Sequence, residues 1–143
     1  MMDRRLKNLC ASVAVFCASS AAVAQEPSHP ADLLKQPDYR AAWTALMKGE
    51  KFARRDSWIP KMQGPGSTTR YRDPHGGDWI EGNVCQPHNC GDNNLIVLAD
   101  PKTKRIYAAQ RTRGDLPRSE RFFGQPDAET RKLLSQRIIA NFP

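Results

Sequence analysis

The first periodic segment of the chain has helical spacing. In "DYRAAWTALMKG", residues 38–49, the bulky side chains Tyr39, Trp43 and Leu46 recur three to four positions apart. Asp38 stands where a capping residue is expected, and Gly49 stands where a helix commonly stops. The pattern therefore predicts an amphipathic helix that begins at Asp38. The aromatic stripe matches one buried helix face, so we interpret it as core rather than as a ligand cage.

A second helical period occupies the end of the sequence, in "GQPDAETRKLLSQRIIANF", residues 124–142. Pro126 lies near a first helical position, and Asp127 and Glu129 fall in the first turn, where the helix dipole favours anions. The apolar residues share one broad face: Leu133, Leu134, Ile138 and Ile139. We expect a helix that packs this face on the core.

Between the two helical segments the chain changes to short strand-like segments separated by turns. The breaker cluster Gly64-Pro65-Gly66 precedes them, and "DPHGG" and "DPKTK" are turn sequences. The expected strands are 67–72 "STTRYR", 78–84 "DWIEGNV", 94–99 "NLIVLA" and 105–112 "RIYAAQRT". Successive short strands joined by turns indicate an antiparallel sheet. Helices on either side of such a sheet make an α+β fold.

The N-terminus has the order of a secretory signal. Basic residues at positions 4, 5 and 7 are followed by an apolar run from about Leu9 and by the small residues Ala22-Val23-Ala24. We expect residues 1–24 to be a cleaved signal peptide and the product to be periplasmic. The apolar run is too short and too diluted by serine for a stable membrane anchor. Residues 25–37, polar and interrupted by Pro27 and Pro30, are interpreted as a leader to one domain over 38–143.

Composition narrows the function. Residues 25–143 number 119, a length that suits one domain. The whole chain has a net charge of +7; residues 1–24 hold three basic residues and one acidic residue, so +5 remains after cleavage. The basic residues are dispersed, and export argues against a nucleic-acid partner. The motifs G-x-S-x-G, H-E-x-x-H and the P-loop are absent from the sequence, so we expect a protein that is not an enzyme.

Candidate chemistry gathers in "NVCQPHNCG", residues 83–91. Cleavage would remove Cys10 and Cys17 and leave Cys85 and Cys90. Zinc usually takes four nitrogen or sulfur ligands, and the pair lacks the C-x-x-C spacing of metal, redox and haem motifs. In an oxidising compartment a disulfide is the simplest state of such a pair, so we predict a Cys85–Cys90 bond and neither metal nor cofactor.

This pair would close a stiff hairpin tip between two strands, facing solvent. Pro87 fixes its own φ and restricts Gln86, so few conformers remain for His88. A rigid tip loses little entropy when it binds a partner. On the residues alone, a structural staple carrying an incidental surface histidine is an equally open interpretation.

The hexapeptide "CQPHNC" resembles the signature Cys-Lys-Pro-His-Asp-Cys of the inhibitor of vertebrate lysozyme (Ivy) family. It keeps both cysteines, the proline and the histidine. The order of Trp43, Gly49 and Trp58 before the loop is similar to the order in the family. The segments "GDNNLIVLADPKTKRIYAAQRT" and "FFGQPDAETRKLL" also resemble family segments, so the similarity spans most of residues 38–140.

The resemblance implies an exported inhibitor whose loop enters the active-site cleft of c-type lysozyme. The binding residues would be Gln86, Pro87, His88 and Asn89, with His88 between the two catalytic carboxyl groups. Gln86 and Asn89 replace the lysine and aspartate of the family, which removes charge-assisted hydrogen bonds. The alternative is a diverged member that acts as an envelope interaction protein, for example on the cell's own wall-cleaving enzymes. Dimers occur in the family, so a homodimer is a further partner arrangement to test.

A set of arginines lies downstream of the loop: Arg111, Arg113, Arg118 and Arg121. They would either form a basic rim around His88 or solvate a surface. We interpret them as solvating a surface, because scattered surface charges need no function.

Overall fold

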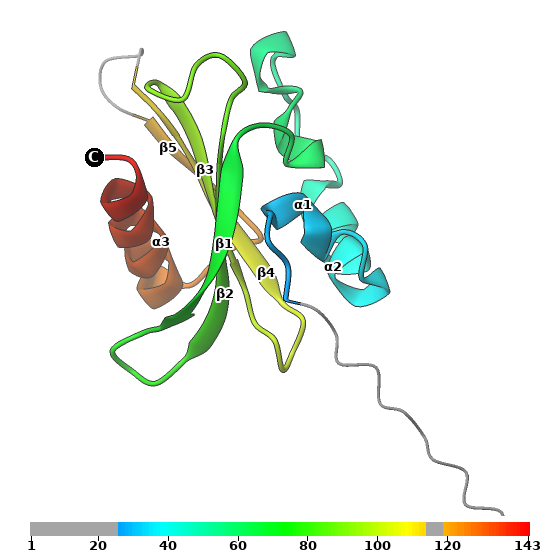
Figure 1. The fold of residues 1–143 in the computed structure, drawn as a ribbon, viewed down its shortest axis with the longest axis vertical. Coiled ribbons are helices and arrows are strands. Elements are labelled where there is room, and N and C mark those ends of the chain that lie inside the picture. Colours follow the sequence, from blue (N-terminus) through cyan, green and yellow to red (C-terminus); the bar gives the residue numbers. More distant parts are fainter. Residues whose placement is uncertain (1–25, 114–118) are drawn as a thin grey trace, which may run out of the picture.

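A computed structural model describes residues 26–113 and 119–143. The expected signal peptide, together with Gln25 and Arg118, lies outside these residues. The described chain forms one five-stranded antiparallel sheet with strand order β1-β2-β3-β4-β5 and helices on both faces (Figure 1). The strands are β1 (Gly66–Arg72), β2 (Asp78–Cys85), β3 (Asn93–Ala99), β4 (Ile106–Thr112) and β5 (Ser119–Phe123). The helices are α1 (Pro30–Leu33), α2 (Pro37–Met47), the 3-10 turns η1 (Arg54–Asp56) and η2 (Ile59–Lys61), and α3 (Ala128–Asn141). The predicted α+β fold is confirmed.

All four predicted strands are present, with ends within one residue of those expected. The fifth strand, β5, was not predicted. Its sequence "SERFF" alternates too weakly and too briefly to mark a strand. It pairs with β4, with Ala108 opposite Phe123 and Thr112 opposite Ser119. Pairing with an existing neighbour therefore stabilises a segment that has little strand character of its own.

The sheet is buried on both faces at its centre, whereas the edge strand β1 is mostly exposed. One face packs against α1, α2 and η2 through an apolar cluster in which the members outside the sheet are Leu33, Tyr39, Trp43, Trp58, Ile59 and Met62. The other face packs against α3 through Ile96 and Leu98 of the sheet and Leu134 and Ile138 of the helix. Every residue of β3 is buried, which explains the uninterrupted apolar run of its sequence. The prediction that the Tyr/Trp stripe is core is confirmed.

Both predicted helix starts need correction. The residue at the N-cap of α2 is Gln36, and Pro37 takes the first helical position, where its missing N–H costs nothing. Asp38 is therefore inside the first turn and is not the cap. In α3 it is Asp127 that caps the helix, because its side chain accepts a 2.8 Å hydrogen bond from the Thr130 N–H.

The apolar face of α3 is narrower than its sequence pattern indicates. Leu134 and Ile138 are fully buried and Leu133 is half-buried, whereas Ile139 is 49% exposed. One turn of helix separates Leu134 from Ile138, and the next residue rotates away from the sheet by about 100°. Ile139 therefore lies at the edge of the contact and does not belong to the core.

The segment interpreted as a leader contributes to the fold over the residues that the structure describes. His29 caps α1, with its Nδ1 accepting from the Ala31 N–H at 3.1 Å. Its Nε2 lies 2.9 Å from the Gly64 carbonyl oxygen. Leu33 is fully buried in the larger core cluster. The described part of this segment therefore packs on one face of the sheet, with Pro30 and Leu33 of α1 buried.

A polar cluster joins α3 to β2. Glu81 is 1% exposed. It accepts two hydrogen bonds from the guanidinium of Arg137, and its Oε1 accepts a third from Asn141 at 3.0 Å. The Glu81 carboxylate raises the pKa of Arg137 above its ordinary value. A buried carboxylate is thereby paired and hydrogen-bonded, as burial of a charge requires.

Over the described ranges, 26–113 and 119–143, no helix has both the length and the apolar character of a membrane span.

Candidate functional site

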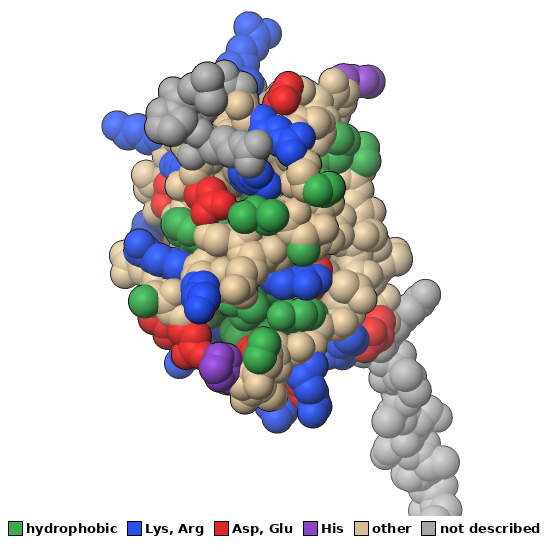
Figure 2. Space-filling model, turned by 90° about the vertical axis from the view of Figure 1, so that its left-hand side faces the viewer, with side chains coloured by type: hydrophobic (Ala, Val, Ile, Leu, Met, Phe, Trp, Pro, Cys, Tyr) green, Lys and Arg blue, Asp and Glu red, His purple; other side chains and the backbone are tan. Residues whose placement is uncertain are grey.

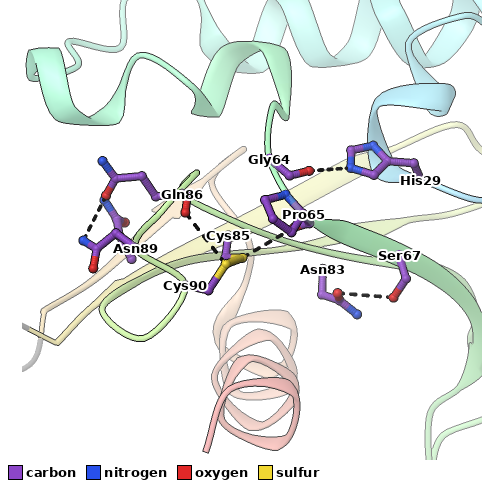
Figure 3. Close-up of a disulfide and its surroundings, with 10 residues drawn as sticks. His29, Gly64, Pro65, Ser67, Asn83, Cys85, Gln86, Asn89 and Cys90 are labelled. Atoms are coloured by element: carbon purple, nitrogen blue, oxygen red, sulfur yellow. Dashed lines mark hydrogen bonds between the residues drawn. A yellow bond between two sulfur atoms is a disulfide. The ribbon is translucent and has the colours of Figure 1, made fainter.

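The cysteine loop lies between two paired neighbours of the sheet, as predicted. β2 and β3 are antiparallel, with Cys85 opposite Asn94 at the end of the ladder. Residues 86–92 connect them. The disulfide links Cys85 to Cys90 across a Cα–Cα distance of 4.8 Å, which is within the usual range for such bonds (Figure 3). The disulfide-closed loop of the predicted fold is therefore confirmed.

The four residues 86–89 form a tight turn. The Asn89 N–H donates to the Gln86 carbonyl oxygen at 3.0 Å, and His88 has φ +64°. Proline fixes a negative φ at the second position, so a positive φ at the third position makes this a type II β-turn. Histidine tolerates this backbone region better than most residues that carry a Cβ. The turn, which we call the His88 turn, is thus specified by Pro87 and closed by the disulfide.

Of the three histidines, His88 is the one whose imidazole has no partner among the described residues. Its side chain is exposed, and within the described residues its imidazole makes neither a hydrogen bond nor an ion pair. The other two imidazoles are engaged. His29 caps α1, and His75 pairs with Glu129 at 3.0 Å. The His88 turn therefore presents a free imidazole to solvent from a constrained backbone.

The other expected binding residues differ in orientation. Asn89 is exposed and Pro87 is half-buried. Gln86 is also half-buried, but its side chain is used inside the protein: Nε2 donates to the Arg55 carbonyl oxygen at 3.1 Å, and Oε1 accepts from the side-chain amide of Asn89 at 3.2 Å (Figure 3). The residue type alone did not predict that the Gln86 side chain would hydrogen-bond to other residues of the same chain.

The chain packs closely behind Cys85 at a position that only glycine can occupy. Gly64 has φ +148°, and a Cβ on it would lie 2.0 Å from the Cys85 carbonyl oxygen. The Cys85 N–H donates to the carbonyl oxygen of Pro65 at 3.0 Å. The breaker cluster predicted at 64–66 is therefore also a backbone support for the first cysteine of the ring. Only glycine allows so close an approach.

A hollow of about 280 Å³ lies beside the turn. Its lining residues are Arg54, Arg55, Ser57, Trp58, Gln63, Gln86 and Pro87. The lining contains two arginines, and Arg55 also lies 3.9 Å from the carboxylate of the neighbouring Asp56, so Arg54 is the better placed to meet an anionic or acceptor-rich group of a partner. This hollow could not be predicted from the sequence, because η1 and η2 carry no strong helical pattern.

The downstream arginines are not the scattered, solvated set that we predicted. Arg111 is 4% exposed and donates to the Phe142 carbonyl oxygen at 3.0 Å. Arg113 donates to the main-chain oxygen of Pro143. Arg121 pairs with Glu50. These side chains are bound to other segments of the chain, which corrects the interpretation for the three that are described.

On the face that α3 covers, Lys and Arg side chains are interspersed with acidic and apolar ones (Figure 2).

The described residues contain no group of three or more His, Cys, Asp or Glu placed to hold a metal ion. The chemistry available at the His88 turn is therefore that of one imidazole, its flanking amides and the neighbouring arginines. Such a set can fill a cleft and form hydrogen bonds there.

The fold and this turn define a small α+β protein that projects a disulfide-closed hairpin tip, and comparison with known proteins assigns it to a family. The chain belongs to the family described as Inhibitor of vertebrate lysozyme (Ivy), whose model matches residues 38–121. The members are non-catalytic protein inhibitors, and the chain is accordingly not an enzyme.

One named relative agrees with this membership, and two uncharacterized proteins are also similar to the chain. The chain is 30% identical over 127 residues to a Pseudomonas aeruginosa protein named Inhibitor of vertebrate lysozyme, covering 82% of each chain. It is 27% identical over 119 residues to an uncharacterized protein of Yersinia pestis, covering 76% of this chain and 75% of the relative. A second Pseudomonas aeruginosa protein, also uncharacterized, is 26% identical over 153 residues, covering 96% and 97%.

Proposed function

We propose that this protein inhibits c-type lysozyme by inserting the His88 turn into the active-site cleft. The observation that carries the proposal is the exposed His88 imidazole, which has no partner among the described residues, at the tip of a disulfide-closed turn. Membership of the Ivy family and the name of the Pseudomonas aeruginosa relative supply the target.

The chemistry of the target suits an imidazole. Lysozyme divides its reaction between a protonated carboxyl group and an ionised one, which lie on either side of the scissile bond. An imidazole has two ring nitrogens and can hydrogen-bond to both groups at once. His88 would then occupy the position of the glycosidic oxygen and exclude the substrate.

The rigidity of the turn favours tight binding. The type II turn and the disulfide already hold the backbone in one conformation, so little conformational entropy remains to be lost on association. The hollow beside the turn would place Arg54 next to the same partner. Although the chain is basic overall, this local arrangement complements an acidic cleft.

The proposal includes export. The basic, apolar and small-residue order of residues 1–24 supports a cleaved signal peptide and a periplasmic location. There the inhibitor would protect the cell wall against lysozyme that has crossed the outer membrane.

The direct test is lysozyme turnover measured against increasing concentrations of the purified mature protein, with an oligosaccharide substrate varied. Competitive inhibition is expected, because the turn and the substrate would occupy one cleft. Full lysozyme activity at high micromolar protein would overturn the proposal. That result would favour the envelope interaction alternative, which the loss of the family's lysine and aspartate at Gln86 and Asn89 also supports.

A further inference from the structure

A buried polar cluster lies directly behind the His88 turn. Asp56, in η1, is 7% exposed. Its Oδ1 accepts hydrogen bonds from Asn93 Nδ2 at 2.8 Å and from Gln110 Nε2 at 3.0 Å. Gln110 Nε2 also lies 3.0 Å from Asn93 Oδ1. One carboxylate thus joins a 3-10 turn to the first residue of β3 and to Gln110 within β4.

The cluster continues into the turn. Asn93 Nδ2 lies 3.2 Å from Gln86 Oε1, the same oxygen that accepts from the side chain of Asn89. Gln86 Nε2 donates to the carbonyl oxygen of Arg55, next to Asp56. Gln86, which begins the turn, is therefore tied to η1 directly, and Asn89, which ends the turn, is tied to η1 through the Gln86 side chain.

The position of this cluster argues for a role beyond stability. Asn93 and Gln110 lie on the face of the sheet whose other members, such as Leu95 and Val97, form the apolar core. Apolar side chains would also fill this space, whereas hydrogen-bonded amides fix the direction of each neighbour. The disulfide closes the ring of residues 85–90, but the tilt of the ring relative to the sheet depends on contacts outside it.

We propose that Asp56 is a positioning residue that sets the orientation of the His88 turn through Asn93 and Gln86. The expected effect on inhibition rests on the proposed function, because the orientation of the His88 turn would govern its insertion into the lysozyme cleft. Gln86 is then part of the support rather than a contact residue. Lysine at this position, as in the family signature, would leave the amides of Asn89 and Asn93 without this acceptor, because lysine only donates.

From the sequence, Gln86 was interpreted as a residue that lacks the charge of the family's lysine. Its role as part of the support leads to a different expectation. Changing Gln86→Lys is expected to weaken inhibition in this chain, by about tenfold, because it removes the acceptor that both amides share. Tighter inhibition by this variant would contradict the assignment of Gln86 to the support.

The decisive experiment compares Asp56→Ala with the conservative variant Asp56→Asn and with Leu134→Ala. The asparagine keeps an oxygen that accepts from Asn93 and Gln110. Leu134 belongs to the core on the opposite face, so its variant loses stability without touching the cluster. The first measurement is of residual dipolar couplings of the backbone N–H groups of Gln86, His88 and Asn89, which report their orientation relative to β3 and require no lysozyme.

We expect Asp56→Ala alone to shift these couplings, while Asp56→Asn and Leu134→Ala keep the wild-type values. Inhibition should weaken by about tenfold in Asp56→Ala and should be restored in Asp56→Asn. If Asp56→Ala does not fold, Gln86→Leu removes the shared acceptor at a half-buried position and should shift the same couplings. Unchanged couplings in the folded variants would overturn the positioning role, even if wild-type protein inhibits. Absence of inhibition by wild type would instead overturn the proposed function.

Discussion

Opening the disulfide ring tests how much the His88 turn depends on it. The better change is Cys90→Ser, because Cys90 is exposed and Cys85 is 5% exposed. A serine at position 90 meets solvent, whereas a serine at position 85 would bury a hydroxyl group in the core. The variant therefore removes the cross-link with little other disturbance.

The magnitude follows from the size of the ring. The sequence separation of the two cysteines is 5, and a ring this small contributes about 2 kcal/mol by loop-closure entropy. The same quantity bounds the effect on binding at about thirtyfold. Backbone hydrogen bonds remain in the open turn, among them those from the Asn89 N–H to the Gln86 carbonyl and from the Gln86 N–H to the Asn93 carbonyl. Because they still restrain the backbone, we expect inhibition to weaken by about tenfold.

Urea unfolding gives the stability change, and lysozyme turnover gives the inhibition constant. The free energy of unfolding of the oxidised wild type should be about 2 kcal/mol higher than that of Cys90→Ser. Wild type unfolded in the presence of reductant is the control and should match the variant. If Cys90→Ser inhibits as strongly as wild type, the preorganisation argument is refuted, whatever the change in stability.

Three further predictions concern the fold. Arg137→Met should lower the free energy of unfolding by about 3–5 kcal/mol because it leaves the Glu81 carboxylate buried and unpaired, and replacing both by leucine should recover most of the loss in urea unfolding. The Trp79 indole N–H, with the backbone N–H groups of the same turn, lowers the pKa of Asp73 despite some burial. Its contribution is therefore present above the unfolded pKa of about 3.9 and is lost as pH falls through the folded pKa, so the stability gap between wild type and Asp73→Asn should narrow in acid; a constant gap would contradict this. Leu33→Ala should cost about 2–5 kcal/mol in urea unfolding, whereas no change would mean that this segment is a leader after all.

The strands and main helices could be predicted because their apolar periods are long enough to be distinctive. The run 94–99 in β3 and the stripe of Tyr39 and Trp43 in α2 each specify a buried surface directly. The elements that were missed are short. α1 has four residues and β5 has five, and each is stable only because other elements pack or pair with it. Such tertiary stabilisation leaves no periodic signal in the sequence.

The site divides in the same way. The disulfide and the constrained turn follow from local chemistry, since Cys85, Pro87 and Cys90 lie within six positions. The support behind the turn joins Asp56, 37 positions before Asn93 and 54 before Gln110, so spacing could not reveal it. The burial of Arg111 could not be predicted for a related reason. Its acceptor, Phe142, is 31 positions away, and a charged residue is by default exposed.

His88 is the central residue of the proposed inhibition, and one comparison of variants tests its role directly. His88→Asn removes the imidazole but suits the positive φ of the turn, because asparagine adopts this backbone region readily. His75→Asn is the matched control: His75 is also exposed, in the turn before β2, and so lies at the opposite end of that strand from His88. A hydrogen bond to a charged group contributes roughly 1.5–3 kcal/mol, so the inhibition constant for lysozyme should rise by about ten- to a hundredfold in His88→Asn and stay unchanged in His75→Asn. Full-strength inhibition by folded His88→Asn protein would contradict the claim that His88 blocks the cleft.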